Sequence, residues 1–551
     1  MTKKLYSILR GDIFWCVLAA LILLIISYYP IYVNYQRTPH DLFYYGMADE
    51  YPIDTTWNLG LIRQGYNGHL ESYLNISSTL PASLSFVKME YTTIGLAARV
   101  LLIDPLMAFH IARFLVSLLF LYIIYRVVAY VWRRPFERIV AYILILFGAS
   151  ITLSPTRDFV ATSVMDALVT QRLTTAGVHY LLGGALAIAS LYFISRVFDA
   201  PTRTRYFIWA VLTGALASLI NAPGMVLVVS SLPVYFCIIA VRSRKDKRIK
   251  KILITQAQIL FSYALISSLP ILYVRYVMTT IWGPYSFSHT EELNPFHLTV
   301  MQYILTMGAT YILSIVAVYR VWKDGKTIFL LIIPWIIMHP VGEYILPVLL
   351  HINRIRYFLL PYYVGFGMLA TVGIFDVARI IKKYIRIIPT SLAAGALLVG
   401  VLLSGYYSYQ VSYNRSFVCF CNAPDFAFGY PKKTVIDALS WLSKHSKEDD
   451  VVLSGYFTGN LIPAFSGNLA YTSWWHRLME SPGFWDVGNR MESFYNGTMT
   501  ESEAAQFIKT NSIRFVLYSP TDRLNPAFQT LPYPFLTPAY EEGDTILYRV
   551  R

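Results

Sequence analysis

IFWCVLAALILLIISYYPIYV, residues 13–33, contains no charged side chain. A membrane-spanning helix needs about 20 mostly apolar residues, so this stretch is long enough to cross a bilayer. Ten further segments of similar character predict about eleven spans in all. They are 108–130, 139–154, 177–195, 206–220, 224–241, 252–278, 298–319, 327–350, 357–378 and 388–407. Only Asn221 to Gly224 separates 206–220 from 224–241, so these two alternatively form one broken or re-entrant pair.

The overall composition also indicates a polytopic α-helical membrane protein. Of the 551 residues, 56% are hydrophobic and only 14% are charged. Soluble proteins carry about 25% charged residues, so the composition excludes a soluble enzyme and a disordered chain. The four cysteines are too few for a disulfide framework in a chain of this length.

The distribution of charge predicts the topology. The net charge is +14, yet residues 408–551 hold 12 basic and 14 acidic side chains, so the basic excess lies in the membrane part. This argues against a nucleic-acid partner and for the positive-inside rule. Of the 34 basic residues in 1–407, 24 lie at one set of helix ends. The sequence therefore predicts a cytoplasmic N-terminus and, after an odd number of spans, an extracytoplasmic tail.

Two segments on the predicted outside face are large enough to carry function. The first outside loop, 34–107, belongs to a predicted membrane domain, 1–407, and the tail, 408–551, is predicted to be an extracytoplasmic α/β domain. In the tail, Thr434 to Asp437 and Thr500 to Glu503 have the pattern of capping boxes that open helices. Apolar runs at 451–453 and 515–518 are typical of buried strands.

Acidic residues gather near the start of the first outside loop: Asp41, Asp49, Glu50 and Asp54. A carboxylate at the boundary between water and lipid is partly desolvated and can act as a general base. A solvated acidic loop explains the same residues about equally well. With His40 these carboxylates are of the kind that bind divalent metals, but their spacing is not diagnostic. The sequence therefore identifies no cofactor, and a divalent metal stays open without support.

Basic residues at the mouths of spans are candidates for binding a phosphate. Arg354 and Arg356 stand two residues apart with His351 one turn earlier, and His179 lies inside an apolar run. A guanidinium binds phosphate oxygens bidentately, although an arginine at a helix end can also simply reach to the interface. Some other charged residues fit solvated loop charges equally well: Arg157, Asp158, Arg172, Lys88 and Glu90.

The order of these stretches resembles the GT-C membrane glycosyltransferases of bacteria and archaea. The resemblance rests on Ile-Arg-Gln-Gly (62–65), Gly-Leu-Ala-Ala-Arg (95–99), Phe-His-Ile-Ala-Arg (109–113), Thr-Ala-Gly-Val-His-Tyr (175–180) and His-Ile-Asn-Arg-Ile-Arg (351–356). It covers most of the chain as an order of elements, and its motifs are moderately specific as a set.

The resemblance implies an inverting enzyme that takes a sugar from a polyprenyl-phosphate donor on the outer face of the membrane. The acceptor would be an envelope glycan, a lipid or a protein. The family's catalytic acidic residue lies in the first outside loop, which by position is Asp54, with Asp41 and Asp49 as competitors. One departure is that the pair Asp49-Glu50 comes well after the first span rather than directly behind it.

Three other functions compete with this one. A transporter or flippase of lipid-linked sugars would place charged residues in mid-span and show an inverted repeat. A non-enzymatic scaffold would use the tail to bind a partner, and a polysaccharide polymerase or ligase would share the substrate class but not the tail. The sequence has no Walker A, dinucleotide-binding or Gly-x-Ser-x-Gly pattern in a usable context, which argues against a nucleotide-sugar enzyme on the inside.

Overall fold

The structure is a computed structural model of the chain. It describes residues 11–46, 52–80, 83–151, 177–199, 203–242, 247–282, 298–324, 326–345, 348–349, 360–415, 429–475, 483–524 and 529–551. These residues form two compact units. The first, here the bundle, comprises Met1–Tyr29, Phe114–Val274 and Asn294–Arg415, and the second, here the loop–tail unit, comprises Pro30–Arg113, Arg275–Leu293 and Ser416–Arg551.

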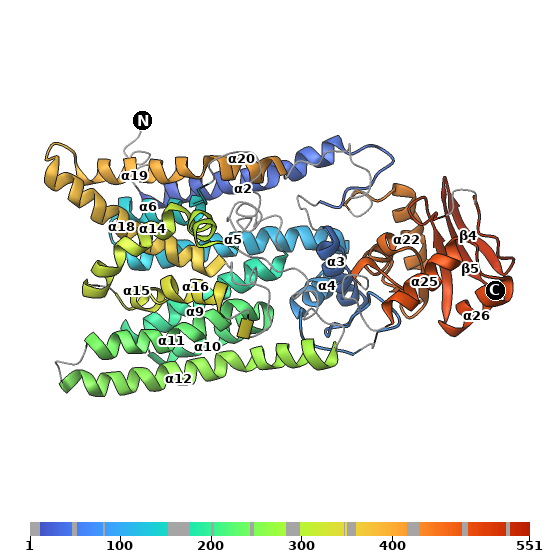
Figure 1. The fold of residues 1–551 in the computed structure, drawn as a ribbon, viewed down its shortest axis with the longest axis horizontal. Coiled ribbons are helices and arrows are strands. Elements are labelled where there is room, and N and C mark those ends of the chain that lie inside the picture. The colour runs from blue at the N-terminus through green and yellow to red at the C-terminus, as the bar shows by residue number, and fades with distance from the viewer. Residues whose placement is uncertain are drawn as a thin grey trace. The chain divides into compact units, whose positions relative to one another are not determined.

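Long apolar helices build the bundle (Figure 1). Within the described residues, eight helices are long and apolar enough to cross a membrane. This confirms a polytopic helical membrane protein, whereas the number eleven stays a prediction. The helices of the chain's membrane part are α2 (Asp12–Arg37), α5 (Pro105–Val131), α6 (Pro135–Phe147), α9 (Val178–Asp199), α10 (Arg203–Ile220), α11 (Ala222–Arg242), α12 (Lys247–Tyr276) with the π-helix η2 (Val277–Ile281), α14 (Val300–Asp324), α15 (Thr327–Ile332), α16 (Trp335–Tyr344), α18 (Leu360–Tyr384), α19 (Thr390–Ser404) and α20 (Tyr406–Arg415).

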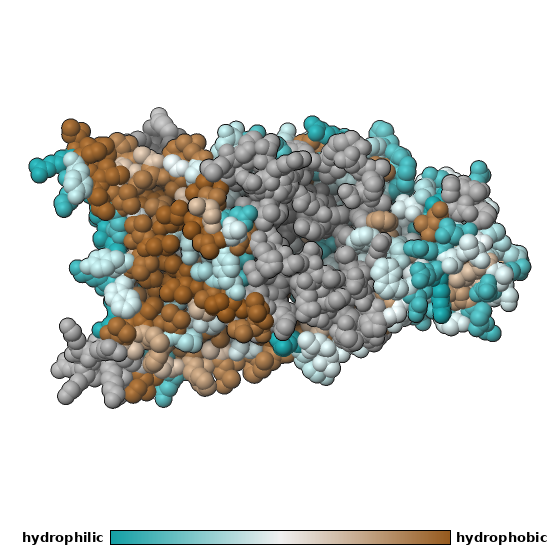
Figure 2. All heavy atoms as spheres, viewed as in Figure 1, coloured by the Kyte–Doolittle hydropathy of each residue, from teal (hydrophilic) through white to brown (hydrophobic). Residues whose placement is uncertain are grey.

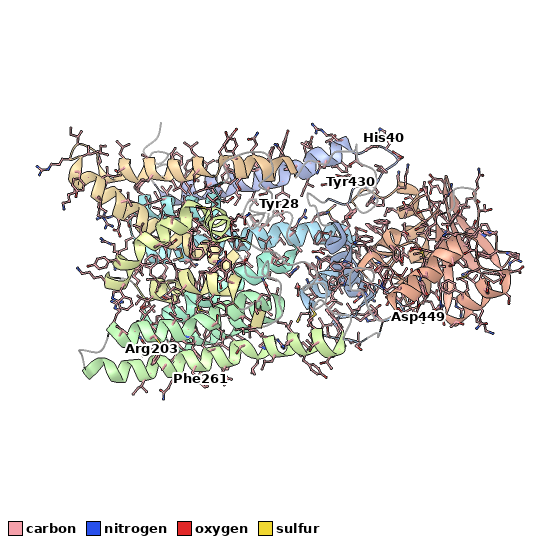
Figure 3. All side chains as sticks on the ribbon, in the orientation of Figure 1. Tyr28, His40, Arg203, Phe261, Tyr430 and Asp449 are labelled. Atoms are coloured by element: carbon pink, nitrogen blue, oxygen red, sulfur yellow. The ribbon has the colours of Figure 1, made fainter. Side chains whose placement is uncertain are left out.

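The helices expose large apolar side chains on their outer faces, as expected of proteins in lipid. Leu21 of α2, Leu115 of α5 and Phe261 of α12 are exposed, and Phe261 is labelled in Figure 3. Figure 2 shows apolar residues covering the visible face of the helices. In water such a surface would aggregate, whereas hydrocarbon accepts it at no cost.

The doubtful pair of spans forms two separate helices. α10 ends at Ile220 and α11 begins at Ala222, with Asn221 between them. The two helices pack on each other, and α10 packs closely on α9. A Cβ at Gly214 of α10 would lie 2.6 Å from Ser267 Oγ of α12, so this helix contact depends on a small residue.

The tail folds into an α/β domain, as predicted. Its five-stranded sheet has the order β2-β1-β3-β5-β4, with parallel pairs at β2-β1 and β1-β3 and antiparallel pairs beyond. The elements are α22 (Lys433–His445), β1 (Val451–Leu453), α23 (Tyr456–Gly459), the π-helix η5 (Ile462–Ser466), β2 (Leu469–Ala470), α25 (Phe484–Tyr495), α26 (Glu501–Thr510), β3 (Ile513–Tyr518), β4 (Leu536–Glu542) and β5 (Thr545–Val550).

The sheet is covered on both faces because successive side chains of a strand point to opposite sides. Phe515 and Leu517 of β3 pack with residues of α22 and η5. Val516 and Tyr518 pack with residues of α25 and α26. The two strands predicted from apolar runs are therefore confirmed as β1 and part of β3.

One of the two predicted capping boxes is confirmed and the other is wrong. Thr500 caps α26: its hydroxyl accepts the Glu503 N–H at 3.3 Å, and its own N–H donates to the Glu503 carboxylate at 2.8 Å. Thr434 is not the N-cap of α22, because that helix begins at Lys433 with no side-chain cap. The Thr434 hydroxyl instead lies 2.8 Å from the Thr545 hydroxyl of β5, so a tertiary contact replaces the local one.

Two helices of the first outside loop belong to the same compact unit as the tail. They are α3 (Pro52–Asn67) and α4 (Met89–Leu101). α3 packs on η5 of the tail as well as on α4. The division of the chain into domains 1–407 and 408–551 remains a prediction about which parts fold and work independently.

Candidate active site

The centre of the loop–tail unit is the crossing of α3 and α4. A Cβ at Gly65 of α3 would lie 1.9 Å from the Thr92 carbonyl oxygen, and one at Gly95 of α4 would lie 1.9 Å from the Ile62 carbonyl oxygen. No other residue type fits at so short a distance between backbones. Two of the five motifs that carried the family resemblance, 62–65 and 95–99, therefore meet in space.

Asp54 lies in the first turn of α3 and is exposed. The free N–H groups of a helix N-terminus favour a negative charge there. Trp57 follows three residues later, and residues three apart share one side of a helix. Asp54 is therefore a solvent-accessible carboxylate on the side of α3 that carries a buried tryptophan.

Lys88 brings a positive charge to the same tryptophan. Its ammonium lies 5.7 Å from the centre of the Trp57 ring and 5.6 Å from the centre of the Tyr91 ring, which is cation–π distance. Lys88 precedes α4 and has φ 67 and ψ 19, the left-handed region that non-glycine residues rarely adopt. Such a strained residue commonly marks a functional position.

Glu90, two residues after Lys88, is buried rather than solvated. It is 7% exposed, and within the described residues neither carboxylate oxygen has a hydrogen-bond partner. Burial raises the pKa of Glu90 to about 7, and the charge of Lys88 opposes part of that rise. The interpretation of Glu90 as an ordinary loop charge is therefore wrong.

Three tryptophans from distant segments pack together, and one of them is Trp57, the ring beside Lys88. The Trp57 ring centre is 6.2 Å from that of Trp282, which follows η2, and 5.3 Å from that of Trp475 in the tail. All three side chains are buried. The cluster links the first outside loop, the segment after η2 and the tail, and its member Trp57 is the ring over which the half-buried Lys88 lies.

Asp41, a competing candidate base, holds the loop to the tail. Its carboxylate accepts a hydrogen bond of 2.6 Å from the Lys432 ammonium, which lowers the pKa of Asp41 below its usual value. The Phe43 N–H donates to the Pro431 carbonyl at 2.8 Å, and the Lys433 N–H donates to the Asp41 carbonyl at 2.8 Å. A carboxylate with a lowered pKa is a weaker base, so this geometry favours a positioning role.

Aromatic stacking continues the same contact. The Tyr44 ring stacks on the Tyr430 ring with centres 5.1 Å apart. Tyr430 and the exposed His40 are labelled in Figure 3. Residues 41–44 thus lie against 430–433 through backbone, charge and ring contacts together.

The start of α5 fixes the other side of this loop segment. The buried Arg113 donates to the Gly46 carbonyl at 3.2 Å, and His110 Nε2 lies 3.1 Å from the Tyr45 carbonyl oxygen. Gly46 has φ +79, and a Cβ there would lie 2.3 Å from the His110 ring. The motif 109–113 therefore anchors the loop, a role that the sequence alone did not assign to it.

The remaining predicted site residues are placed less fully. His179 lies in the first turn of α9, in the bundle, with its ring 4.1 Å from that of Tyr180. Asp49, Glu50, His351, Arg354 and Arg356 lie outside the described residues. The described residues place Lys88 beside Trp57, which stands three residues after Asp54 on α3. They contain no group of three or more His, Cys, Asp or Glu that could hold a metal ion.

Lys88 and Glu90 are the site residues that sequence reasoning missed. Their only local signal was that they stand between the apolar Val87 and Tyr91. Their burial depends on α3, which comes from another part of the loop, so it could not be seen in the local pattern.

Solved structures show which fold this is. The archaeal oligosaccharyltransferase AglB from Archaeoglobus fulgidus, in complex with an inhibitory peptide and a dolichol-phosphate, matches at 13% identity and a TM-score of 0.56. The match covers 92% of this chain and 69% of AglB. ArnT from Cupriavidus metallidurans, bound to undecaprenyl phosphate, matches at 12% identity and a TM-score of 0.51, covering 97% of each chain.

These similarities confirm the GT-C fold, because both proteins are GT-C membrane glycosyltransferases. The same Archaeoglobus protein, tethered to an acceptor peptide containing the NVT sequon, matches equally well. No protein-family model and no curated protein sequence matches the chain.

Proposed function

We propose that the protein transfers a sugar from a polyprenyl-phosphate-linked donor to an envelope glycan, lipid or protein acceptor on the outer face of the membrane. The observation that carries the proposal is the GT-C fold over 97% of the chain, shared with an ArnT that binds undecaprenyl phosphate. A second neighbour binds dolichol-phosphate. Both ligands are polyprenyl-type phosphates, which supports this donor class and leaves the sugar and the acceptor open.

In the proposed mechanism a carboxylate of the first outside loop acts as the general base. It takes the proton from an acceptor hydroxyl, whose oxygen attacks the anomeric carbon as the bond to the phosphate oxygen breaks. The polyprenyl phosphate leaves with the bonding electrons, and the anomeric configuration is inverted. Asp54 is the first candidate because it is exposed, stands at a helix N-terminus and lies on the Trp57 side of α3.

Cations are needed to stabilise the leaving phosphate. The proposed donor-phosphate residues are Arg354, Arg356 and His351 at the mouth of a predicted span, and His179 inside an apolar run. The position of Lys88 on Trp57 supports adding it to this set. Lys88 is half-buried against two aromatic rings, and an ammonium partly shielded from water interacts with a phosphate more strongly than a fully solvated one. The mechanism assigns no step to a cofactor.

The topology is also part of the proposal. The N-terminus is placed in the cytoplasm and the tail outside by the distribution of 24 of 34 basic residues. Reporter fusions after residue 250 should report the cytoplasm, and fusions after residue 420 should report the outside. A cytoplasmic signal at 420 would overturn the topology together with the outward-facing reaction.

One observation favours the transporter alternative. His339 and Glu343 of α16 are fully buried in the bundle, and His339 Nδ1 lies 2.7 Å from the Tyr303 hydroxyl. Ionisable residues buried inside membrane-spanning helices commonly mark substrate or ion pathways. Both residues lie near the end of one candidate span, Thr327–Tyr344. A transport pathway would instead need such residues on several helices.

A single assay distinguishes a transferase from a flippase and from a non-enzymatic scaffold. The purified protein is reconstituted in sealed vesicles with a radiolabelled polyprenyl-phosphate hexose and cell-envelope acceptors, with and without chelation of divalent cations. A transferase moves the label from the lipid to the acceptor. A flippase moves intact donor across the bilayer, and a scaffold does neither, so either of these outcomes would overturn the proposal.

A further inference from the structure

The turn that joins α4 to α5 exposes an unusual amount of apolar surface. Val100 is 81% exposed, Leu101 65% and Leu102 88%, and Met107 follows at 56%. A protein surface in water rarely shows so many large apolar side chains side by side, and where it does the patch commonly marks an interaction site. Leu102 and its neighbours lie before the first residue of α5, Pro105.

Leu102 occupies a backbone conformation that suits glycine. It has φ 54 and ψ 39, in the left-handed region, directly after the last residue of α4. Helices commonly end this way, but usually with glycine at this position, because a Cβ is strained there. The chain therefore carries a large apolar side chain where a residue without one would fit the backbone better.

Hydrogen bonds on both sides hold this turn in place. The Ile103 N–H donates to the Ala98 carbonyl at 2.9 Å and ends α4. The Asp104 carboxylate accepts from the Leu106 N–H at 2.9 Å and caps the start of α5. The exposed leucine is thus presented by a well-defined turn, and its exposure is built into the connection.

Continuity with a membrane-spanning helix identifies the partner as lipid. α5, Pro105–Val131, is long and apolar enough to cross a bilayer, and it begins three residues after Leu102. Its outward side chains, such as Leu115 and Leu119, are exposed in the same way. Arg99 stands just before the patch and is exposed, and an exposed arginine beside an apolar patch suits the level of the lipid headgroups.

We propose that Val100, Leu101 and Leu102 form an apolar wedge that inserts into the interfacial region of the bilayer beside α5. The wedge fixes the C-terminal end of α4 at the membrane. Since α4 crosses α3 at Gly95 and Gly65, the same contact sets where α3 lies at the membrane surface. Insertion of the wedge does not depend on the reaction that the protein catalyses.

Fluorescence quenching by lipids tests the wedge directly. The four native cysteines are replaced by serine, a single cysteine is introduced as Leu102→Cys and labelled with bimane, and the full chain is reconstituted in phosphatidylethanolamine–phosphatidylglycerol vesicles. Doxyl groups at a shallow acyl position should quench this label at least twofold, and aqueous iodide should quench it little. Leu21→Cys, in the first span, is the control for lipid, and Ser440→Cys, exposed on α22, is the control for water.

Each other result overturns the proposal. Quenching by iodide but not by doxyl lipids would place the turn in water. Quenching by neither would mean that another protein surface covers the patch. A second variant, Leu102→Gly, relieves the backbone strain and removes the side chain. For this variant the bimane label is attached at Leu101→Cys. Leu102→Gly should not lower the midpoint of thermal unfolding in detergent, and it should reduce quenching by doxyl lipids at least twofold. Unchanged quenching would also overturn the proposal.

Discussion

The helices of the bundle and helix α3 of the loop–tail unit differ in which side chains they bury. The bundle helices are apolar and leave large side chains such as Leu21 and Phe261 exposed to the surroundings. α3 contains two threonines, two asparagines and a glutamine, and every residue from Thr55 to Ile62 is buried. The apolar content of the sequence therefore locates the spans. For α3, which carries the candidate base, the polar content would wrongly predict an exposed helix.

The difference has a physical cause. A span satisfies its backbone hydrogen bonds internally and needs only lipid or another apolar helix around it, so its own sequence is sufficient. α3 must bury polar side chains, and this requires partners that come from α4, η5 and the tryptophan cluster. The loop–tail unit is thus held by contacts between distant segments. Five predictions test this contrast and the site built on it.

The largest effect is expected at Asp54. Replacement as Asp54→Asn keeps the size and removes the charge, so turnover should fall about 100- to 10,000-fold if this carboxylate is the base. Asp486→Asn is a matched control, because Asp486 is also an exposed residue in the first turn of a helix, α25. Donor consumption per minute in vesicles is the measurement. Normal turnover of Asp54→Asn beside an inactive Asp49→Asn would move the role to Asp49.

A pair of glycines tests the contrast between the two units. Gly95→Ala places a methyl group 1.9 Å from the Ile62 carbonyl and should destabilise the α3–α4 crossing by about 3 kcal/mol. Gly395→Ala in α19 of the bundle meets nothing within 4 Å and should change stability little. Thermal unfolding of both proteins in detergent measures the difference. Equal midpoints for the two variants would contradict the close crossing.

The sequence predicted features that are set within one turn of the chain, and it did not predict features that depend on distant segments. Helix α26 and its capping box were predicted because Thr500 and Glu503 act within one turn. The capping box at Thr434 failed because the Thr545 hydroxyl on a distant strand takes that side chain. For Glu90 the sequence left a solvated charge open for the same reason, since its burial comes from packing between separate helices. Trp57 and Lys88 meet only through the fold, so their contact was not readable from spacing.

Glu90 predicts a pH dependence of stability in the loop–tail unit. Its pKa rises from its usual value of 4.5 to about 7 because it is buried. The free energy of unfolding is therefore highest below about pH 4.5 and falls as the pH rises to about 7, by roughly 3 kcal/mol for a shift of this size. Glu90→Gln should remove this decline and be more stable than the native protein at pH 8. Chemical unfolding at pH 5, 6, 7 and 8 measures it, and parallel curves for the two proteins would contradict the burial.

A smaller effect is expected at the two arginines that precede α18. If Arg354 and Arg356 bind the donor phosphate, each alanine variant should weaken donor binding about tenfold, since a charge-assisted hydrogen bond contributes about 1.5–3 kcal/mol. Lysine should restore part of the affinity. Arg386→Ala, at a predicted cytoplasmic helix end, is the control. Unchanged affinity in both alanine variants would leave these residues with an interfacial role only.

The smallest effect is expected at Asp41. Its pair with Lys432 is largely exposed, so Asp41→Asn should lower stability by less than about 1 kcal/mol. The hydrogen bond from Lys432 lowers the pKa of Asp41, so this contribution is present at neutral pH and is lost only as the pH falls through that lowered pKa. Turnover should change little, and Lys432→Gln should reproduce the result. A collapse of turnover in Asp41→Asn alone would make Asp41 the base.

The central claim is that the sugar leaves a polyprenyl phosphate and is joined to an acceptor in one chemical step. The most direct measurement is the ratio of free polyprenyl phosphate released to hexose bound to acceptor, determined by mass spectrometry of both fractions from the same sealed vesicles. The account predicts a ratio of about one to one that requires the acceptor and is abolished in Asp54→Asn. Donor that is moved across the bilayer intact, or consumed without any acceptor product, would contradict it.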